Sequence, residues 1–207
     1  MTKISERGMI FNAEMVRALL DGRKTQTRRP IKWKQTRFTE IGEREDGSKW
    51  PWSEDAEHAC DFWHPCPFGA VGDRIWVREA FRVHSRATDV ATLVYKASER
   101  NSWTEQTRRV PVAVCNKPAT PEKWTPSLHM PRWASRILLE ITGVRVERLR
   151  SMNQDDARAE GVIAASGPMD AGLAFRELWD SIYGEESWKA NPWVWVIEFK
   201  RVEGGAA

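Results

Sequence analysis

The segment Ala13-Glu-Met-Val-Arg-Ala-Leu-Leu20, which runs directly into Asp21-Gly-Arg-Lys-Thr-Gln-Thr-Arg-Arg-Pro30, decides how the fold of this chain is interpreted. Four apolar residues of the first part recur at the spacing of one helical face: Met15, Val16, Leu19 and Leu20. This periodicity predicts an amphipathic helix, and Asp21-Gly22 predicts its end. The residues that follow carry four cations and two hydroxyls, so we expect a polar turn that attracts anions.

The crowding of cations in this turn bears on Lys24. Each neighbouring positive charge disfavours a protonated amine, so the sequence predicts a lowered pKa for Lys24. Thr25 and Thr27 place two hydroxyls within reach of that amine. The alternative interpretation is a solvated basic turn with no function.

Composition indicates a single domain over residues 1–207. The chain has 207 residues, of which 41% are hydrophobic, and this suffices for a core. Its 32 basic and 29 acidic residues give a net charge of +3, which is too small to indicate nucleic-acid binding by itself. No apolar run approaches the ~20 residues of a membrane span and the N-terminus lacks a signal-peptide core, so we expect a cytoplasmic protein without membrane contact. Three cysteines, Cys60, Cys66 and Cys115, fit a reducing compartment.

Tryptophan is the compositional outlier, with twelve residues against two tyrosines. Some of these side chains must belong to the core, because an indole buries a large apolar area. Others lie in polar or proline-rich surroundings: Trp50, Trp52, Trp63, Trp124 and Trp133. As a set interleaved with Arg and Lys they favour a flat, base-like ligand. For any one of them, plain packing is the alternative.

Alternating and periodic patterns predict short strands with few helices. We expect strands over 74–81, 92–95, 110–114 and 193–200, and a strand pair or one bent strand around Gly143 over 135–149. Helices are expected over 154–160 and 173–182. Residues 32–67 show no periodicity and are interpreted as an insertion or a long functional loop.

Four motifs occur in a characteristic order along the chain: Gly22-Arg-Lys-Thr-x-Thr-Arg28, Gly72-Asp-x-Ile-x-Val-Arg-Glu79, Ala157-Arg-Ala-Glu-Gly161 and the closing Trp195-Val-Ile-Glu-Phe199. In this order they resemble the ASCH-domain family. The segment Pro126-Ser-Leu-His-Met-Pro-Arg-Trp133 is further similar to the longer phage and prophage members. The resemblance implies an α+β fold built on a small PUA-like β-barrel, with flanking helices and loop insertions at about 32–67 and 85–116.

The resemblance also implies an activity. Small bacterial ASCH amidohydrolases, about half as long as this chain, cleave N4-acetylcytidine to cytidine and acetate. They use a lysine, a threonine and a glutamate and no metal or other cofactor. The matching positions here are Lys24, Thr27 and Glu160, so a modified cytosine nucleoside or a nucleic acid is the expected partner. Further residues are expected to bind the substrate: Arg23, Thr25, Arg28, Arg29, Glu79, His129, Arg132 and Trp133.

The chemistry of these three residues is coherent. A neutral Lys24 would remove the proton of the Thr27 hydroxyl, which attacks the acyl carbon, while neighbouring arginines hold the oxyanion. Glu160 would protonate the leaving nitrogen, bind the cytosine edge or activate the second-step water. In an extended strand, however, Lys24 and Thr27 point to opposite sides. The scheme therefore requires a turn or bulge at Thr25-Gln26, and Thr25 is an alternative nucleophile.

Other interpretations remain open. His58, Cys60, His64 and Cys66 are clustered, but their spacing is unlike that of most zinc sites, and loop packing is favoured over metal binding. A nucleic-acid-binding module is the main alternative to the enzyme, with an open basic groove continued by four arginines: Arg108, Arg109, Arg145 and Arg148. A ribonuclease is a third alternative.

Overall fold

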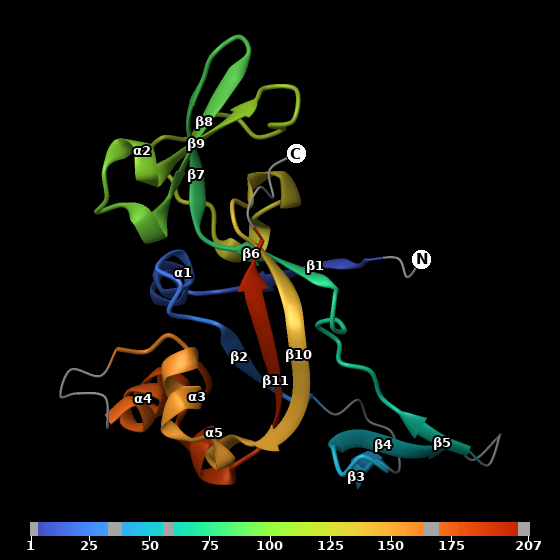
Figure 1. Ribbon diagram of the computed structural model, residues 1–207. Coiled ribbons are helices and arrows are strands. Elements are labelled where there is room, and N and C mark those ends of the chain that lie inside the picture. The colour runs from blue at the N-terminus through green and yellow to red at the C-terminus, as the bar shows by residue number, and fades with distance from the viewer. Residues whose placement is uncertain (1–3, 33–38, 56–59, 164–169, 203–207) are drawn as a thin grey trace. The chain divides into compact units, whose positions relative to one another are not determined.

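The computed structural model is a mixture of helices and strands (Figure 1), and it describes residues 4–32, 39–55, 60–163 and 170–202. Within these ranges the strands form open sheets, and none of the sheets closes into a barrel. The expected α+β class is confirmed.

The eleven strands of the described chain are β1 (Glu6–Ile10), β2 (Gln26–Pro30), β3 (Thr39–Glu43), β4 (Lys49–Asp55), β5 (Cys60–Trp63), β6 (Arg74–Arg78), β7 (Phe81–Arg86), β8 (Val90–Tyr95), β9 (Thr107–Pro111), β10 (Leu138–Arg148) and β11 (Trp193–Arg201). The α-helices are α1 (Ala13–Leu20), α2 (Trp103–Gln106), α3 (Gln154–Ala159), α4 (Ala171–Tyr183) and α5 (Glu185–Ala190). Four single-turn 3-10 helices complete the description: Lys96–Ser98, Ser127–His129, Arg132–Ala134 and Leu149–Ser151.

The chain is divided into two compact units, each made of segments that are distant in sequence. The first unit comprises Met1–Gly22, Arg74–Glu140 and Arg201–Ala207. The second comprises Arg23–Asp73 and Ile141–Lys200.

In the first unit, α1 forms because its apolar stripe is buried and its ends are capped. The Asn12 side chain accepts a hydrogen bond from the Met15 N–H at 2.8 Å, which satisfies a free donor of the first turn. Gly22 follows the helix with φ at 74°, a conformation that glycine adopts without strain. The helix and its end therefore match the sequence prediction.

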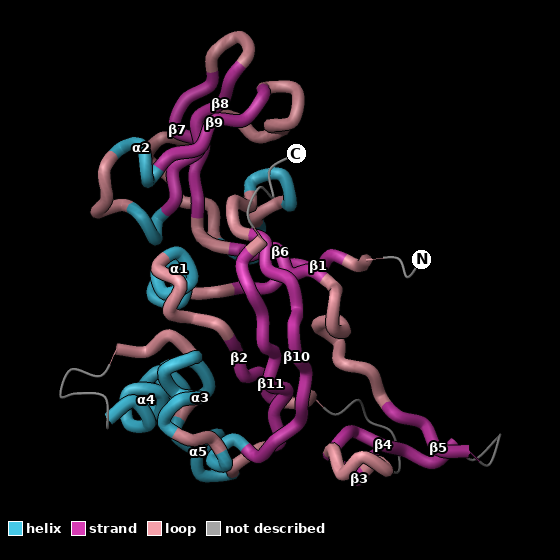
Figure 2. Tube along the Cα trace, viewed as in Figure 1, coloured by secondary structure: helices cyan, strands magenta, loops and turns pink. Residues whose placement is uncertain are grey.

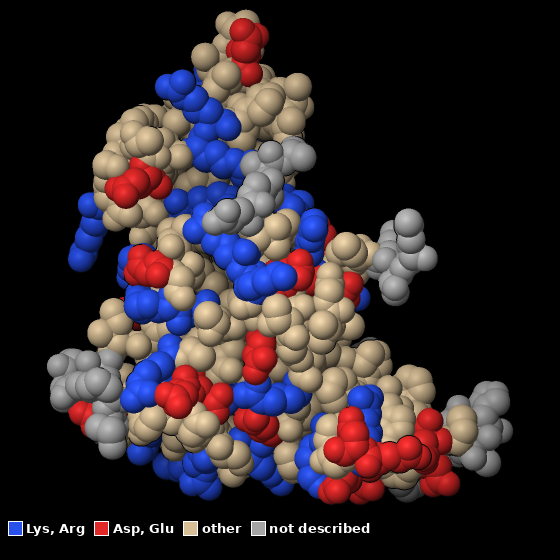
Figure 3. Space-filling view, in the orientation of Figure 1, with Lys and Arg blue, Asp and Glu red and all other residues tan. Residues whose placement is uncertain are grey.

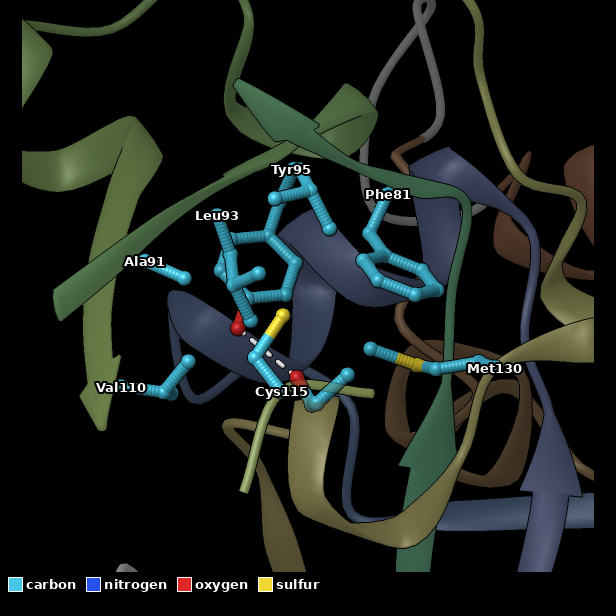
Figure 4. Close-up of a cluster of buried hydrophobic side chains, with 9 residues drawn as sticks. Phe81, Ala91, Leu93, Tyr95, Val110, Cys115 and Met130 are labelled. Carbon is cyan, nitrogen blue, oxygen red and sulfur yellow. Dashed lines mark hydrogen bonds between the residues drawn. The ribbon is translucent and has the colours of Figure 1, made fainter. Parts of the chain in front are cut away.

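The sheets of the first unit follow from alternation. Strand β1 is parallel to β6, and β6 is antiparallel to the first residues of β10. Strands β7, β8 and β9 form an antiparallel sheet, drawn in green in Figure 1. Its buried face carries a core that includes Phe81, Leu93, Tyr95 and Met130 (Figure 4), where the Tyr95 hydroxyl donates a 2.7 Å hydrogen bond to the Ala134 carbonyl.

In the second unit, β11 pairs antiparallel with β2 and also neighbours β10. Helices α3, α4 and α5 gather together, as Figure 2 shows. Phe175 and Trp179, one helical turn apart on α4, pack in one cluster with Val194 and Val196, which alternate along β11. A separate antiparallel sheet is formed by β3, β4 and β5.

The elements differ from the expectations in identifiable places. The segment around Gly143 is one continuous strand, β10, which confirms the single strand of the two predicted alternatives, although it begins later than expected, at Leu138. Residues 39–43, 49–55 and 60–63 form strands, so of the two interpretations of 32–67, an insertion or a long functional loop, the loop is wrong in the described part. The strand expected over 110–114 lies earlier, as β9, and ends at Pro111, which lacks the N–H that a strand in the sheet donates.

Gly69 precedes β6 in a turn that only glycine fits. Its φ is 129°, and a Cβ there would lie 2.9 Å from Cδ1 of the buried Ile141. We therefore expect Gly69→Ala to lower the free energy of unfolding by about 1–3 kcal/mol, since backbone strain and overpacking add. Gly172→Ala is the control, because its Cβ would meet nothing closer than 3.4 Å. Urea unfolding curves compare the two, and equal midpoints would contradict the expectation.

Candidate functional site

The candidate site is built on β2 and the end of α3, both in the second unit. Strand β2 is regular along its length, with Gln26 opposite Glu198 and Thr27 opposite Ile197 on β11. The regular pattern continues backward, because the Thr25 carbonyl accepts a hydrogen bond from the Phe199 N–H at 2.9 Å. The segment expected to be a polar turn is therefore a strand from Gln26 onward, and side chains alternate along it.

Lys24 and Glu160 are brought together although 136 residues separate them. Lys24 Nζ donates one 2.8 Å hydrogen bond to Glu160 Oε2 and another of 2.8 Å to the Glu160 carbonyl. The Lys24 side chain is fully shielded from solvent, and that of Glu160 is 2% exposed. Glu160 is the C-terminal cap residue of α3, and this position places its carboxylate next to Lys24.

Arg28 is the second buried cation of the site. Its Nη1 lies 3.3 Å from Glu160 Oε1, and its Nη2 lies 3.3 Å from Glu147 Oε2 and 3.4 Å from Asp156 Oδ2. One guanidinium therefore faces three carboxylates, one of which it shares with Lys24. A buried charge is tolerated when it is paired in this way.

Asp156 and Arg145 extend the network. Asp156 accepts hydrogen bonds from Gln26 Nε2 at 3.2 Å and from Arg145 Nη2 at 3.0 Å. Arg145 also forms ion pairs with Glu147 and Glu198. The carboxylates raise the pKa of Arg145 against the opposing effect of burial. For Asp156, burial raises the pKa, but hydrogen bonds from Asn153 and Gln26 and the nearby arginines outweigh it, and the net shift is downward.

Burial lowers the pKa of the Lys24 amine, because the charged form loses its hydration. The charge and hydrogen bond of Glu160 oppose the shift, whereas the charges of Arg29 and Arg28 add to it. The direction agrees with the sequence prediction, but the main cause is burial rather than neighbouring cations.

The two threonines lie differently from Lys24. Contacts with 156–160 place the side chains of Lys24, Gln26 and Arg28 on one face of the strand. By alternation Thr25 and Thr27 point to the opposite face. Thr25 is exposed and Thr27 is 1% exposed. The turn or bulge that a direct Lys24–Thr27 contact requires is absent from the described strand.

The remaining predicted residues of the second unit lie along the same segment. Arg23 Nη1 donates a 2.6 Å hydrogen bond to the Gly161 carbonyl. Arg29 is half-buried and opposes Trp195 on β11.

Four predicted residues belong to the first unit. Glu79 is buried and receives two hydrogen bonds from Arg136, of 2.8 and 3.0 Å. Burial raises the pKa of Glu79, and Arg136 opposes the shift. The remaining three lie around the short 3-10 helices: His129 is exposed, Arg132 donates to Glu6 at 2.9 Å, and Trp133 packs edge-on to Phe81.

No group of three or more His, Cys, Asp and Glu side chains in the described ranges is placed to hold a metal ion. His58 lies outside those ranges, so the four-residue cluster proposed for zinc is not described as a whole. His64 Nε2 lies 2.9 Å from Ser53 Oγ. None of the helices described has the length and apolar character that crossing a membrane requires.

Sequence reasoning missed Gln26, Glu147 and Asp156. The signal was present as two periodicities: positions 24, 26 and 28 share one face of a strand, and positions 156 and 160 share one face of a helix. Pairing these two rows requires knowing that α3 lies against β2, which local patterns do not provide.

Comparison of the chain with known proteins identified no relative. No family model matches the chain, and neither the curated proteins nor the solved structures contain a significant match.

The lowered pKa of Lys24 has a consequence for stability. Between its folded pKa and the unfolded value of 10.5, the unfolded chain binds a proton that the folded chain does not, so stability rises with pH. We expect the free energy of unfolding of the wild type to increase from pH 7 to pH 10 relative to that of Lys24→Met. Urea titrations of both proteins at the two pH values measure this difference, and a parallel pH dependence would show that the pKa is not lowered.

Proposed function

We propose that this protein is an amidohydrolase that removes the acyl group from N4-acylated cytosine nucleosides, of which N4-acetylcytidine is the simplest. The observation that carries the proposal is the buried Lys24–Glu160 pair, flanked by Arg28. The ordered motifs support it as well, since they resemble those of ASCH amidohydrolases. We also propose, on the same resemblance, that the fold is related to the PUA-like barrels.

Lys24 and Glu160 are suited to moving protons. Burial favours the neutral form of a lysine amine, and a neutral amine can accept a proton at physiological pH. Two acceptors of Glu160 orient the Nζ atom, which leaves its third substituent position for a reacting group. Shielding from water strengthens each of these interactions.

A water molecule is the nucleophile that this geometry favours. Lys24 would take a proton from the water, whose oxygen then adds to the acyl carbon. The C–N4 bond breaks as the proton passes to N4, which gives the free amine and a carboxylic acid. Arg28 offers a positive charge to the developing oxyanion. Both side chains are shielded, so the substrate must displace the groups that cover them.

Lys24 and Arg28 are poorly suited to binding a phosphate. Lys24 and Arg28 already face carboxylates, and those carboxylates would repel a phosphate. Arg145, one of the arginines assigned to a basic groove, is likewise engaged by three carboxylates. The site therefore favours the enzyme over the nucleic-acid-binding alternative.

We expect purified protein to convert N4-acetylcytidine to cytidine, as followed by chromatography. Lys24→Arg should lower kcat at least about 100-fold, because a guanidinium does not deprotonate in this pH range. Glu160→Gln should have a loss of similar size. Arg158→Ala, on the exposed side of α3, is the matched control and should retain activity. Circular dichroism melts confirm that each variant is folded. A Lys24→Arg protein with the wild-type rate, or a wild type without hydrolysis, would refute the proposal.

The nucleophile is tested separately by Thr27→Val, which removes the hydroxyl but keeps the shape. Because Thr27 points away from Lys24, we expect less than about a tenfold loss of kcat, and the same for Thr25→Val. A loss in Thr27→Val comparable to that of Lys24→Arg, together with an acylated wild-type protein in the mass spectrum, would assign the attack to Thr27 instead.

A further inference from the structure

The sheet of β3, β4 and β5 in the second unit carries three tryptophans on one face. Trp50 and Trp52 are two residues apart on β4, so they point to the same side, and Trp63 of β5 lies directly opposite Trp52. Gly42 of β3 shares this side, because a Cβ there would lie 3.0 Å from the Trp63 ring and 3.2 Å from Cβ of Trp52. We call the side of the sheet defined by Trp50, Trp52 and Trp63 the tryptophan face.

One half of the tryptophan face holds a cation of the chain itself. The Arg44 guanidinium lies 4.1 Å from the centre of the Trp50 ring and 5.3 Å from the centre of the Trp63 ring. Trp50 is fixed in place, because its Nε1 donates a 2.7 Å hydrogen bond to the His64 carbonyl and its ring lies edge-on to that of Trp195. These indoles therefore accept a guanidinium against their π-systems, which attract cations.

The other half, around Trp52, has carboxylates instead of a cation. Trp52 lies opposite Glu40 of β3, and two residues further along β4 Glu54 lies directly opposite Asp61 of β5. By alternation all three acids belong to the tryptophan face, and all three are exposed. Within the described ranges no cationic side chain forms an ion pair with any of them. Like charges directly opposite each other destabilise a sheet, so this half of the face would gain from a cation.

The charge of the surrounding segment favours a cationic partner as well. Residues 39–63 carry eight Asp and Glu residues against two Lys and Arg residues, whereas the whole chain carries 29 against 32. Of the two cations, Arg44 lies on the indoles and Lys49 pairs with Glu43 on the opposite side of the sheet. In Figure 3, red side chains gather over the part of the surface that belongs to β3, β4 and β5. Charge complementarity therefore selects a positively charged partner.

The geometry of the sheet favours an extended polypeptide over a small cation. The three acids lie on three neighbouring strands and span about 10 Å, which is more than one cation covers. In the described chain β5 is the last strand of the sheet, so a partner segment can add to it through main-chain hydrogen bonds. Side chains of an added strand alternate, so one row would lie beside Asp61 and the other beside Phe62, which is 48% exposed.

The chemistry of the face favours arginine over lysine. A guanidinium is planar, so it stacks on an indole while its N–H groups donate to carboxylates, whereas an ammonium is a compact point charge. Arg44 already shows the stacked arrangement on this sheet.

We propose that the tryptophan face, with Glu40, Glu54 and Asp61, docks an extended segment of a partner protein that carries arginines at alternate positions. A guanidinium of the partner stacks on the Trp52 ring and pairs with the two opposed carboxylates, whose repulsion it relieves. This surface contains none of the residues of the proposed catalytic site and does not depend on the proposed hydrolysis.

The test measures binding of a fluorescein-labelled octapeptide of alternating arginine and leucine by anisotropy, at low and at physiological salt. Glu54→Gln/Asp61→Asn should weaken binding about fivefold or more, because two ion pairs are lost. Trp52→Ala should weaken it at least about threefold, because the cation loses its ring. Glu43→Gln/Glu45→Gln is the matched control, since it removes the same charge from exposed positions off the tryptophan face. It should bind within about twofold of the wild type at physiological salt, which screens distant charges.

Stability separates lost binding from lost folding. Without peptide, Glu54→Gln/Asp61→Asn should unfold in urea at the same midpoint as the wild type or at a higher one, because the opposed like charges are gone. Saturating peptide should raise the melting temperature of the wild type more than that of this variant.

Three results would overturn the proposal. The first is no binding of the arginine peptide by the wild type at low salt, and the second is an equal loss of affinity in the two double variants. The third is equal affinity for the lysine counterpart of the peptide with no effect of Trp52→Ala, which would identify a general polycation surface. Hydrolysis of N4-acetylcytidine should be the same in Glu54→Gln/Asp61→Asn and the wild type, so a failure of either proposal is seen independently of the other.

Discussion

The second unit depends on the pairing of two buried charges, Lys24 just before β2 and Arg28 within it. Lys24 and Arg28 are shielded from solvent, and a shielded cation without a partner costs several kcal/mol. Glu160 supplies one carboxylate to both, so α3 must end at a fixed place against the strand. The cap of α3 contributes to this placement, because the Asn153 side chain accepts from the Asp156 N–H while Asp156 also faces Arg28. A single helix end therefore fixes the strand, the charges and the candidate reactive groups together.

The same constraint distinguishes Lys24 and Arg28 from the arginines Arg78 and Arg82 of the first unit. At the Lys24–Glu160 site Lys24 and Arg28 both lie against carboxylates, and burial lowers the pKa of the Lys24 amine, which is the direction that suits proton transfer. In the first unit, Arg78 lies near the Trp76 ring and donates to the Leu128 carbonyl, and Arg82 lies near the Trp124 ring. Arginine therefore occurs in two settings in one chain, and the difference is the number of acids within reach rather than the residue type.

The sequence predicted helices and strands well where a single hydrophobic periodicity dominates. It predicted them poorly where a strand is buried only through contacts with residues distant in sequence. Helix α1 and strand β11 were predicted from their apolar patterns. The helix expected over 154–160 matches α3, which ends with Glu160 as its C-terminal cap. Strand β2 was missed, because its charged side chains are buried only through partners more than a hundred residues away. Strands β3, β4 and β5 were missed as well, since Gly42 and the proline in β4 obscure the alternation. The candidate pair Lys24–Glu160 came from the resemblance, whereas its partners Asp156 and Glu147 required the structure.

The order in which the chain is synthesised gives the division into units a further meaning. The first unit takes residues from both ends and the middle of the chain, and the second takes two segments on either side of that middle. On a ribosome, β2 emerges more than a hundred residues before α3 and β11, so Lys24 and Arg28 lack the partners that those elements supply until they have been made. Contacts of such long sequence separation form slowly, because a large loop must close first. Neither unit consists of one contiguous segment, and a chain that stops before residue 160 lacks the glutamate that pairs with Lys24.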